Sequence, residues 1–75
     1  MRITYDPRAD VLAITWRDSS PGGGREVAPD LFVECDAAGL PIGMELLNAS
    51  KHMEDDPLSV GLELLVPEAT PTGGR

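Results

Sequence analysis

Hydrophobic and polar residues alternate in several short stretches of this chain, a pattern typical of strands with one buried face. Alternation over residues 3–5 and residues 11–17 is interrupted by the turn-forming stretch Asp-Pro-Arg-Ala-Asp. Proline cannot donate to a ladder and aspartate accepts from nearby amides, so this stretch predicts a tight connection. The two segments therefore predict an antiparallel hairpin, with Leu12, Ile14 and Trp16 on one side of its second strand.

A second hairpin is predicted from residues 31–36 and 41–47, which flank a turn that contains Gly39. A four-residue loop over residues 37–40 gives one side of this hairpin wholly apolar partners, whereas a three-residue loop would mix the two sides. We therefore favour the longer loop. The predicted register sets Cys35 opposite Ile42, Val33 opposite Met44 and Leu31 opposite Leu46.

The remaining segments have weaker or competing patterns. Residues 18–24, which include Gly22 to Gly24, predict a flexible loop. Residues 25–29 are expected to pair only briefly before the next strand begins. Residues 48–54 predict a helical turn capped by Asn48 or Ser50. Two interpretations of residues 58–66 remain open, because both a strand period and a helical period fit; we favour helix or irregular cover for the sheet.

These elements together define the expected architecture. We expect a mainly β protein, on the border of the α+β class, in which a four-stranded antiparallel sheet of two hairpins carries a short C-terminal helical segment. Residues 48–66 are expected to pack over the sheet. Residues 1–66 are expected to form one β-rich domain, and residues 67–75 a disordered tail.

Length and composition narrow the classes of function. A chain of 75 residues has a small core of its own, and its single cysteine rules out an internal disulfide, so oligomerisation is the expected means of stabilisation. The net charge of −7 and the scattered basic residues argue against nucleic-acid binding. The start of the chain lacks a signal peptide and no apolar run could span a membrane, so we expect a cytoplasmic protein.

Two motifs resemble a known family. The stretch Tyr-Asp-Pro-Arg-Ala-Asp-Val-Leu from Tyr5 is similar to the opening Tyr-Asp-x-x-Ala-Asp-x-Leu signature of the small bacterial family called domain of unknown function 2283. Gly43, Glu45 and the Ala-Ser pair at residues 49–50 resemble its second motif. The resemblance implies a compact antiparallel β domain without an established activity. It also implies an antitoxin-like partner role, because genes of this family are often seen beside those of ribonuclease-type toxins.

Three aspartates are candidates for a metal site. Asp6 and Asp10 flank one predicted turn, and Asp36 lies at another. Three carboxylates at one edge of a sheet could hold a hard cation such as calcium or magnesium. Aspartates at turns more commonly bond the local backbone, and no calcium-loop spacing is present. The structural interpretation is therefore favoured, and no cofactor is predicted.

Other candidate groups favour structural roles. Glu34 and Glu45 share one side of adjacent strands, but glycoside hydrolysis would need a cleft around them that so small a domain can hardly supply. Cys35 lies on the predicted apolar side, away from a catalytic role with His52. The three glycines before Arg25 lack the Lys-Ser or Lys-Thr of a phosphate-binding loop. No catalytic constellation is found, so the sequence predicts a protein that is not an enzyme.

A sheet whose strands have apolar residues on both sides needs a packed layer on each side, and a partner could supply one of these layers. The sequence thus predicts a protein-interaction module, most simply a homodimer or the partner of a small basic protein. The alternative is a domain that binds a small ligand or divalent metal at the acidic turns. The residues expected at the interface are Val11, Ala13, Trp16, Leu31, Val33 and Met44.

Overall fold

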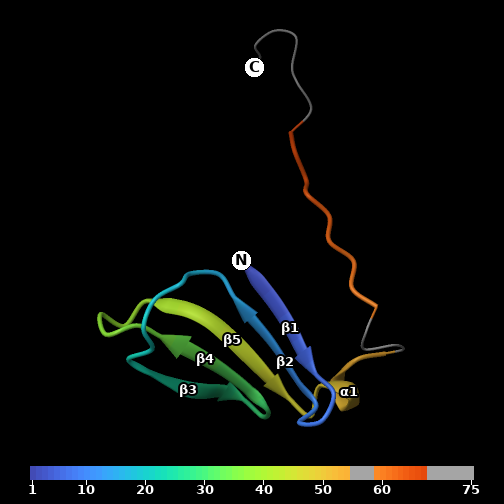
Figure 1. The fold of residues 1–75 in the computed structure, drawn as a ribbon, viewed down its shortest axis with the longest axis horizontal. Coiled ribbons are helices and arrows are strands. Elements are labelled where there is room, and N and C mark those ends of the chain that lie inside the picture. The colour runs from blue at the N-terminus through green and yellow to red at the C-terminus, as the bar shows by residue number, and fades with distance from the viewer. Residues whose placement is uncertain (55–58, 68–75) are drawn as a thin grey trace, which may run out of the picture.

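The computed structural model of the protein describes residues 1–54 and 59–67. Within these residues the chain forms one antiparallel sheet of five strands and a short helix (Figure 1). The mainly β class predicted from the sequence is therefore confirmed. The elements are β1 (Arg2–Asp6), β2 (Val11–Thr15), β3 (Gly23–Ala28), β4 (Leu31–Cys35), β5 (Pro41–Leu47) and α1 (Ala49–His52).

The strand order is β1-β2-β5-β4-β3, and every neighbouring pair is antiparallel. Both predicted hairpins are present, β1 with β2 and β4 with β5. They join through β2 and β5, which places the last strand at the centre of the sheet. The number of strands differs from the prediction, because β3 pairs with β4 over its length and adds a fifth strand.

Close backbone approach explains why β3 was not recognised as a full strand. A Cβ atom on Gly22 would lie 2.6 Å from the Cα atom of Ala37, and one on Gly24 would lie 2.9 Å from the carbonyl oxygen of Val33. Glycine is required at such places because no side chain fits. The predicted flexible loop is thus wrong for Gly23 and Gly24, which pair with Cys35 and Glu34 of β4.

The predicted register of the second hairpin is confirmed for two of its three pairs. Leu31 lies opposite Leu46 and Val33 lies opposite Met44, as the requirement for one apolar side demands. Cys35 pairs with Pro41 rather than with Ile42, because the register shifts between Glu34 and Cys35. Such a bulge leaves one residue of β5 without a directly opposite partner.

The two sides of the sheet differ in chemistry. Directly opposite residues on neighbouring strands point to the same side, so the register assigns each side chain. We call one side the apolar face; it consists of Ile3, Tyr5, Leu12, Ile14, Leu31, Val33, Met44 and Leu46, with Arg25 at its β3 edge. The other side, the mixed face, includes Thr4, Ala13, Thr15, Glu26, Phe32, Glu34, Glu45 and Leu47.

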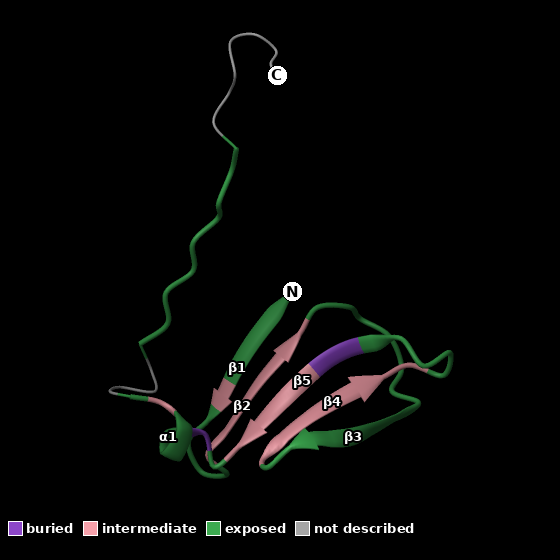
Figure 2. Ribbon diagram, turned by 180° about the vertical axis from the view of Figure 1, so that it is seen from behind, coloured by how far each residue is buried: buried purple, intermediate pink, exposed green. Residues whose placement is uncertain are grey.

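The sheet has little buried interior. Among the described residues, the hydrophobic side chains classed as fully buried are Ile42, 2% exposed, and Ala49, 0% exposed. Every residue of β2 and β4 is only half-buried (Figure 2). None of the helices in the part of the chain described here is long and apolar enough to cross a membrane.

The predicted cover of the sheet by residues 48–66 is only partly observed. Helix α1 is present and its Ala49 is buried. Residues 59–67 form neither helix nor strand, so the helical interpretation is wrong there and the irregular alternative describes their backbone. Because these residues are exposed, they do not provide the predicted cover. Gly61 disfavours a helix, and the strand period of this stretch has no neighbouring strand to pair with. Leu58 and the tail beyond Pro67 lie outside the described residues.

Candidate functional site

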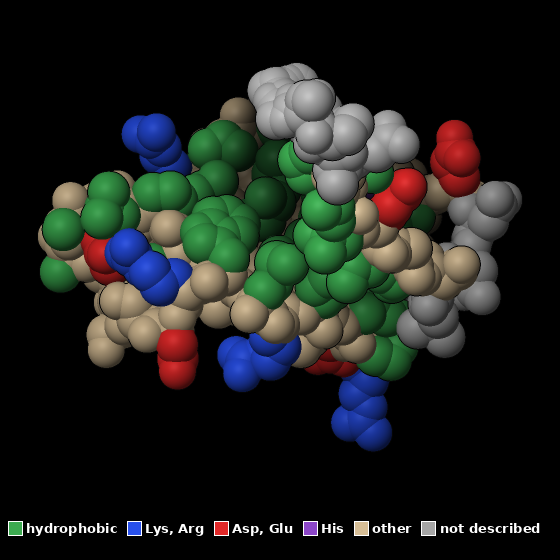
Figure 3. Space-filling model, turned by 90° about the horizontal axis from the view of Figure 1, so that it is seen from above, with side chains coloured by type: hydrophobic (Ala, Val, Ile, Leu, Met, Phe, Trp, Pro, Cys, Tyr) green, Lys and Arg blue, Asp and Glu red, His purple; other side chains and the backbone are tan. Residues whose placement is uncertain are grey.

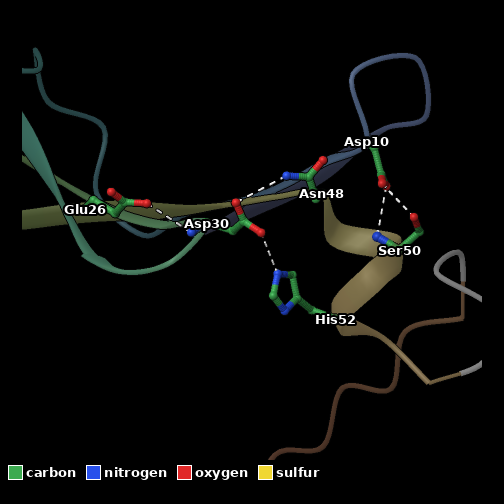
Figure 4. A network of polar contacts seen from close by, with 6 residues as sticks. All are labelled: Asp10, Glu26, Asp30, Asn48, Ser50 and His52. Atoms are coloured by element: carbon green, nitrogen blue, oxygen red, sulfur yellow. Dashed lines mark hydrogen bonds and ion pairs between the residues drawn. The ribbon is translucent and has the colours of Figure 1, made fainter.

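Asp10 connects the first hairpin to the end of β5. Its carboxylate accepts hydrogen bonds from the Tyr5 hydroxyl at 2.7 Å, the Ser50 amide at 3.0 Å and the Ser50 hydroxyl at 2.6 Å. Its carbonyl oxygen accepts from the Ala49 amide at 2.9 Å. These bonds satisfy exposed donors of the first turn of α1. The capping predicted for Asn48 or Ser50 is wrong, because the acceptor is Asp10 (Figure 4).

The hydrogen bonds at Asp10 also set its protonation. The Ser50 hydroxyl and then the Tyr5 hydroxyl hold the pKa of Asp10 below its ordinary value. The same contact raises the pKa of Tyr5, because its hydroxyl donates to a carboxylate. Both shifts favour a charged Asp10 that accepts from neutral donors. The carboxylate oxygens are thus engaged in holding the chain together.

The other two predicted aspartates bond the backbone of their own turns. Asp6 accepts from the amide of Arg8 at 2.9 Å. Asp36 accepts from the amides of Ala38 and Leu40, each at 2.9 Å, and pairs with the guanidinium of Arg17. The Leu40 amide holds the pKa of Asp36 below its ordinary value, with Arg17 acting in the same direction. These contacts are those expected of aspartates that stabilise turns.

The three candidate metal ligands are not brought together. Asp6 and Asp10 lie at the end of the sheet that holds the last residue of β5, whereas Asp36 lies at the end that holds its first residue. At about 3.3 Å per residue, the seven residues of β5 separate the two turns by about 20 Å. Within the described ranges, no group of three or more acidic, histidine or cysteine residues is placed to hold a metal ion.

A second polar network centres on Asp30, which the sequence analysis did not single out. Asp30 accepts from the Asn48 side-chain amide at 3.2 Å, and its other carboxylate oxygen lies 2.9 Å from Nε2 of His52 (Figure 4). Its carbonyl oxygen accepts from the Leu47 amide at 2.8 Å. His52, and to a smaller extent Asn48, hold the pKa of Asp30 below its ordinary value.

The signal that the sequence offered for this second network is the position of Asp30, which precedes a strand as Asp10 does. Asp10 and Asp30 each stand directly before a strand, and each adopts a left-handed backbone, with φ of 57° and 69°. Aspartate tolerates this conformation better than most residues do. Both then bond the segment that follows β5. The two aspartates together fix α1 against the end of the sheet.

The remaining candidate pairs stay apart or lack a surrounding cleft. Glu45 lies opposite Phe32, so Glu34 and Glu45 are diagonal neighbours on the mixed face, as predicted. Cys35 is the last residue of β4 and lies opposite Pro41 at the start of β5, whereas His52 lies in α1, beyond the other end of β5. A Cys-His pair is therefore not formed.

The predicted interface residues divide between the two sides of the sheet. Leu31, Val33 and Met44 lie on the apolar face, whereas Val11 and Ala13 point to the mixed face. Trp16, just after β2, is 39% exposed, and its indole donates a hydrogen bond of 2.9 Å to the Pro41 carbonyl oxygen. Figure 3 shows hydrophobic side chains grouped on the part of the surface that is seen from above. The apolar face, whose residues named above are half-buried or exposed, is the best candidate for a functional surface.

The fold defines a class of small antiparallel β proteins, in which a five-stranded sheet has one apolar and one mixed side. The chain matches the family described as Protein of unknown function (DUF2283) over residues 2–50, and it belongs to this family. The matched region includes all five strands and ends at Ser50, the partner of Asp10. Comparison with curated proteins and with solved structures gives no match.

Proposed function

We propose that this protein is a cytoplasmic, non-enzymatic interaction module that acts as a homodimer through its apolar face. The observation that carries the proposal is the open apolar side of the sheet. A sheet with a hydrophobic side buries that side against another layer in stable folds. Apart from the buried Ile42, the apolar side chains of that layer are only half-buried or exposed. Helix α1 lies at one end of the sheet (Figure 1).

The distribution of charge favours a second copy as the partner. The net charge of −7 opposes self-association when acidic groups are brought together. The strand glutamates Glu26, Glu34 and Glu45 all point to the mixed face, and the apolar face carries only Arg25 at its edge. Two apolar faces can therefore meet while these acidic groups stay on the outer surfaces of the dimer.

The engagement of the turn carboxylates supports a non-enzymatic role. Asp6, Asp10 and Asp36 are bonded to backbone amides and to the side chains of their own fold. The apolar face offers area and shape rather than reactive groups. A small basic protein is the alternative occupant of this face, in line with the acidic charge and the role that the family resemblance implies.

The homodimer can be tested by light scattering from dilute to concentrated solution with a matched pair of variants. Met44→Lys places a charge on the apolar face, and Ala13→Lys places the same charge on the mixed face beside Glu45. We expect Met44→Lys to yield monomers and Ala13→Lys to remain dimeric, because burying an unpaired charge is strongly unfavourable.

Circular dichroism of both variants checks that the sheet persists. The midpoint of thermal unfolding should rise with concentration for the wild type and for Ala13→Lys, because dimerisation stabilises the folded state. Monomers of the wild type at every concentration would contradict the homodimer. A basic protein recovered in a one-to-one complex with such a monomer would identify the other occupant.

A further inference from the structure

Residues 59–67, which we call the arm, form an extended apolar segment outside the sheet. In Figure 1 the arm leads away from the strands beyond the α1 end. No backbone hydrogen bond joins the arm to a strand within the described residues. Its large hydrophobic side chains are mostly in solvent: Val60 is 61% exposed, Leu62 81%, Leu64 84%, Leu65 80% and Val66 67%.

The arm has the same two-sided pattern as the strands of the sheet. Val60, Leu62, Leu64 and Val66 alternate with Gly61, Glu63 and Leu65. In an extended strand, the first set would point to one side and the second set to the other. Paired in the plane of the sheet, the arm would extend the apolar face with one set and the mixed face with the other.

The two edges of the sheet differ in how well they could accept an added strand. The β3 edge contains Gly23 and Gly24, has a register shift between Glu26 and Ala28, and is followed by Pro29. Bulges, glycine and proline at an edge discourage further pairing. The β1 edge has none of these features, since β1 pairs with β2 in an unbroken register of five residue pairs. Its middle residues, from Ile3 to Tyr5, are uncharged.

We propose that the arm of one chain pairs as an added strand with the free edge of β1 in a second copy. This inference rests on the proposed homodimer and specifies how its two chains are linked. A two-fold axis makes the exchange reciprocal, because each chain supplies one arm and one β1 edge. At about 3.3 Å per residue, residues 60–66 extend about 20 Å, which is enough to pair with all five residues of β1.

The pairing can be tested with cysteines placed on different chains. In a Cys35→Ala background, one sample carries Thr4→Cys on β1 and the other carries Glu63→Cys on the arm. Both positions would lie on the mixed face in the proposed dimer. After the samples are mixed and have exchanged chains, a short bis-maleimide is added, and mass spectrometry identifies the covalent heterodimer. Circular dichroism checks that each variant retains the sheet.

The matched control replaces Thr4→Cys by Glu26→Cys. Glu26 lies in the same cross-strand row as Thr4 but at the opposite, β3 edge. We expect a several-fold higher yield of heterodimer with Thr4→Cys than with Glu26→Cys. Equal or negligible yields from samples that light scattering shows to be dimeric would overturn the arm exchange and leave the homodimer standing.

A chain that carries both Thr4→Cys and Glu63→Cys tests whether the arm pairs instead with β1 of its own chain. If the linker joins the two cysteines only within one chain, then the arm binds its own β1, and pairing with a second copy is wrong. If the unmodified protein is monomeric at every concentration, then the proposed function fails together with the exchange.

Discussion

At the scale of single residues, the carboxylate of Asp10 joins two distant parts of the chain. It accepts bonds from Ser50, forty positions further along the chain, and from Tyr5 within its own hairpin. The Tyr-Asp-x-x-Ala-Asp signature and the Ala-Ser motif thus meet in one cluster of hydrogen bonds. In this chain, the contact joins the two segments that resemble the family motifs.

We expect Ser50→Ala to lower the free energy of unfolding by about 1 kcal/mol, because one side-chain hydrogen bond to Asp10 is lost. Asp10→Ala should be more harmful and lower the unfolding midpoint by several degrees, since three donors lose their acceptor. Thermal and urea unfolding measure both effects. Ser20→Ala, in the exposed loop after β2, is the control and should change little. Additive effects of Asp10→Ala and Ser50→Ala would contradict the direct contact.

Acid should destabilise the fold through three aspartates. The pKa values of Asp10, Asp30 and Asp36 are held below the ordinary 3.8, chiefly by Ser50, His52 and the Leu40 amide respectively. Carboxylates with a depressed folded-state pKa contribute stability above the ordinary value, and this stability is lost as pH falls through the lower value. We therefore expect the free energy of unfolding to fall with pH once it drops below about 4.

Urea unfolding at a series of pH values measures this loss. Asp36→Asn should be less stable near neutral pH and should show a shallower decline in acid, because it lacks one of the titrating groups. An unchanged acid slope in this variant would show that Asp36 does not contribute. Above pH 10.0, the raised pKa of Tyr5 acts in the opposite sense, since stability is lost as Tyr5 ionises in the folded protein.

At the scale of elements, the close contact between β2 and β5 depends on a glycine. A Cβ atom on Gly43 would lie 2.6 Å from the carbonyl oxygen of Ile14, so the two strands would have to separate. Gly43 is opposite Thr15 in the register, near the centre of the sheet. The Gly-x-Glu part of the family motif thus has a steric explanation.

We expect Gly43→Ala to lower the free energy of unfolding by about 1–3 kcal/mol, as overpacked positions do. The matched control is Gly61→Ala, compared in dilute solution where exchange of the arm does not contribute, because a Cβ atom there meets nothing of its own chain within 4 Å. Its effect should stay within about 0.5 kcal/mol. Urea unfolding of the two variants makes the comparison. Equal effects would show that contact with β2 is not what requires glycine at position 43.

The same elements show which parts of the fold could be predicted from sequence. The pairs Leu31–Leu46 and Val33–Met44 follow from the need for one apolar side, which local alternation reveals. Strand β3 has no such alternation. Its Gly24 closely approaches Val33 of β4, and that neighbour is known only in the folded chain. The role of Asp10 as the acceptor for α1 was missed for a similar reason, since its partner is distant in sequence.

At the scale of the whole molecule, the sheet and the arm raise the same physical problem. Each presents apolar side chains that the described part of the chain does not fully cover. Full burial of one exposed Leu or Val side chain contributes about 1.5–3 kcal/mol, so covering several of them is comparable with the usual net stability of a small domain. Alternation predicted a partner, and this stays a prediction. That Val11 and Ala13 lie on the other side of the sheet from Met44 could be known only from the register.

The position of β5 in the sheet has a consequence for synthesis on the ribosome. The hairpin of β1 and β2 is made first, yet the strand that pairs with the other edge of β2 is made last. An isolated hairpin is at best marginally stable in water, so the emerging chain cannot complete its sheet until Leu47 is added. Three residues later comes Ser50, which bonds to Asp10. The shortest nascent chain that contains every strand and this contact ends where the match to the family ends.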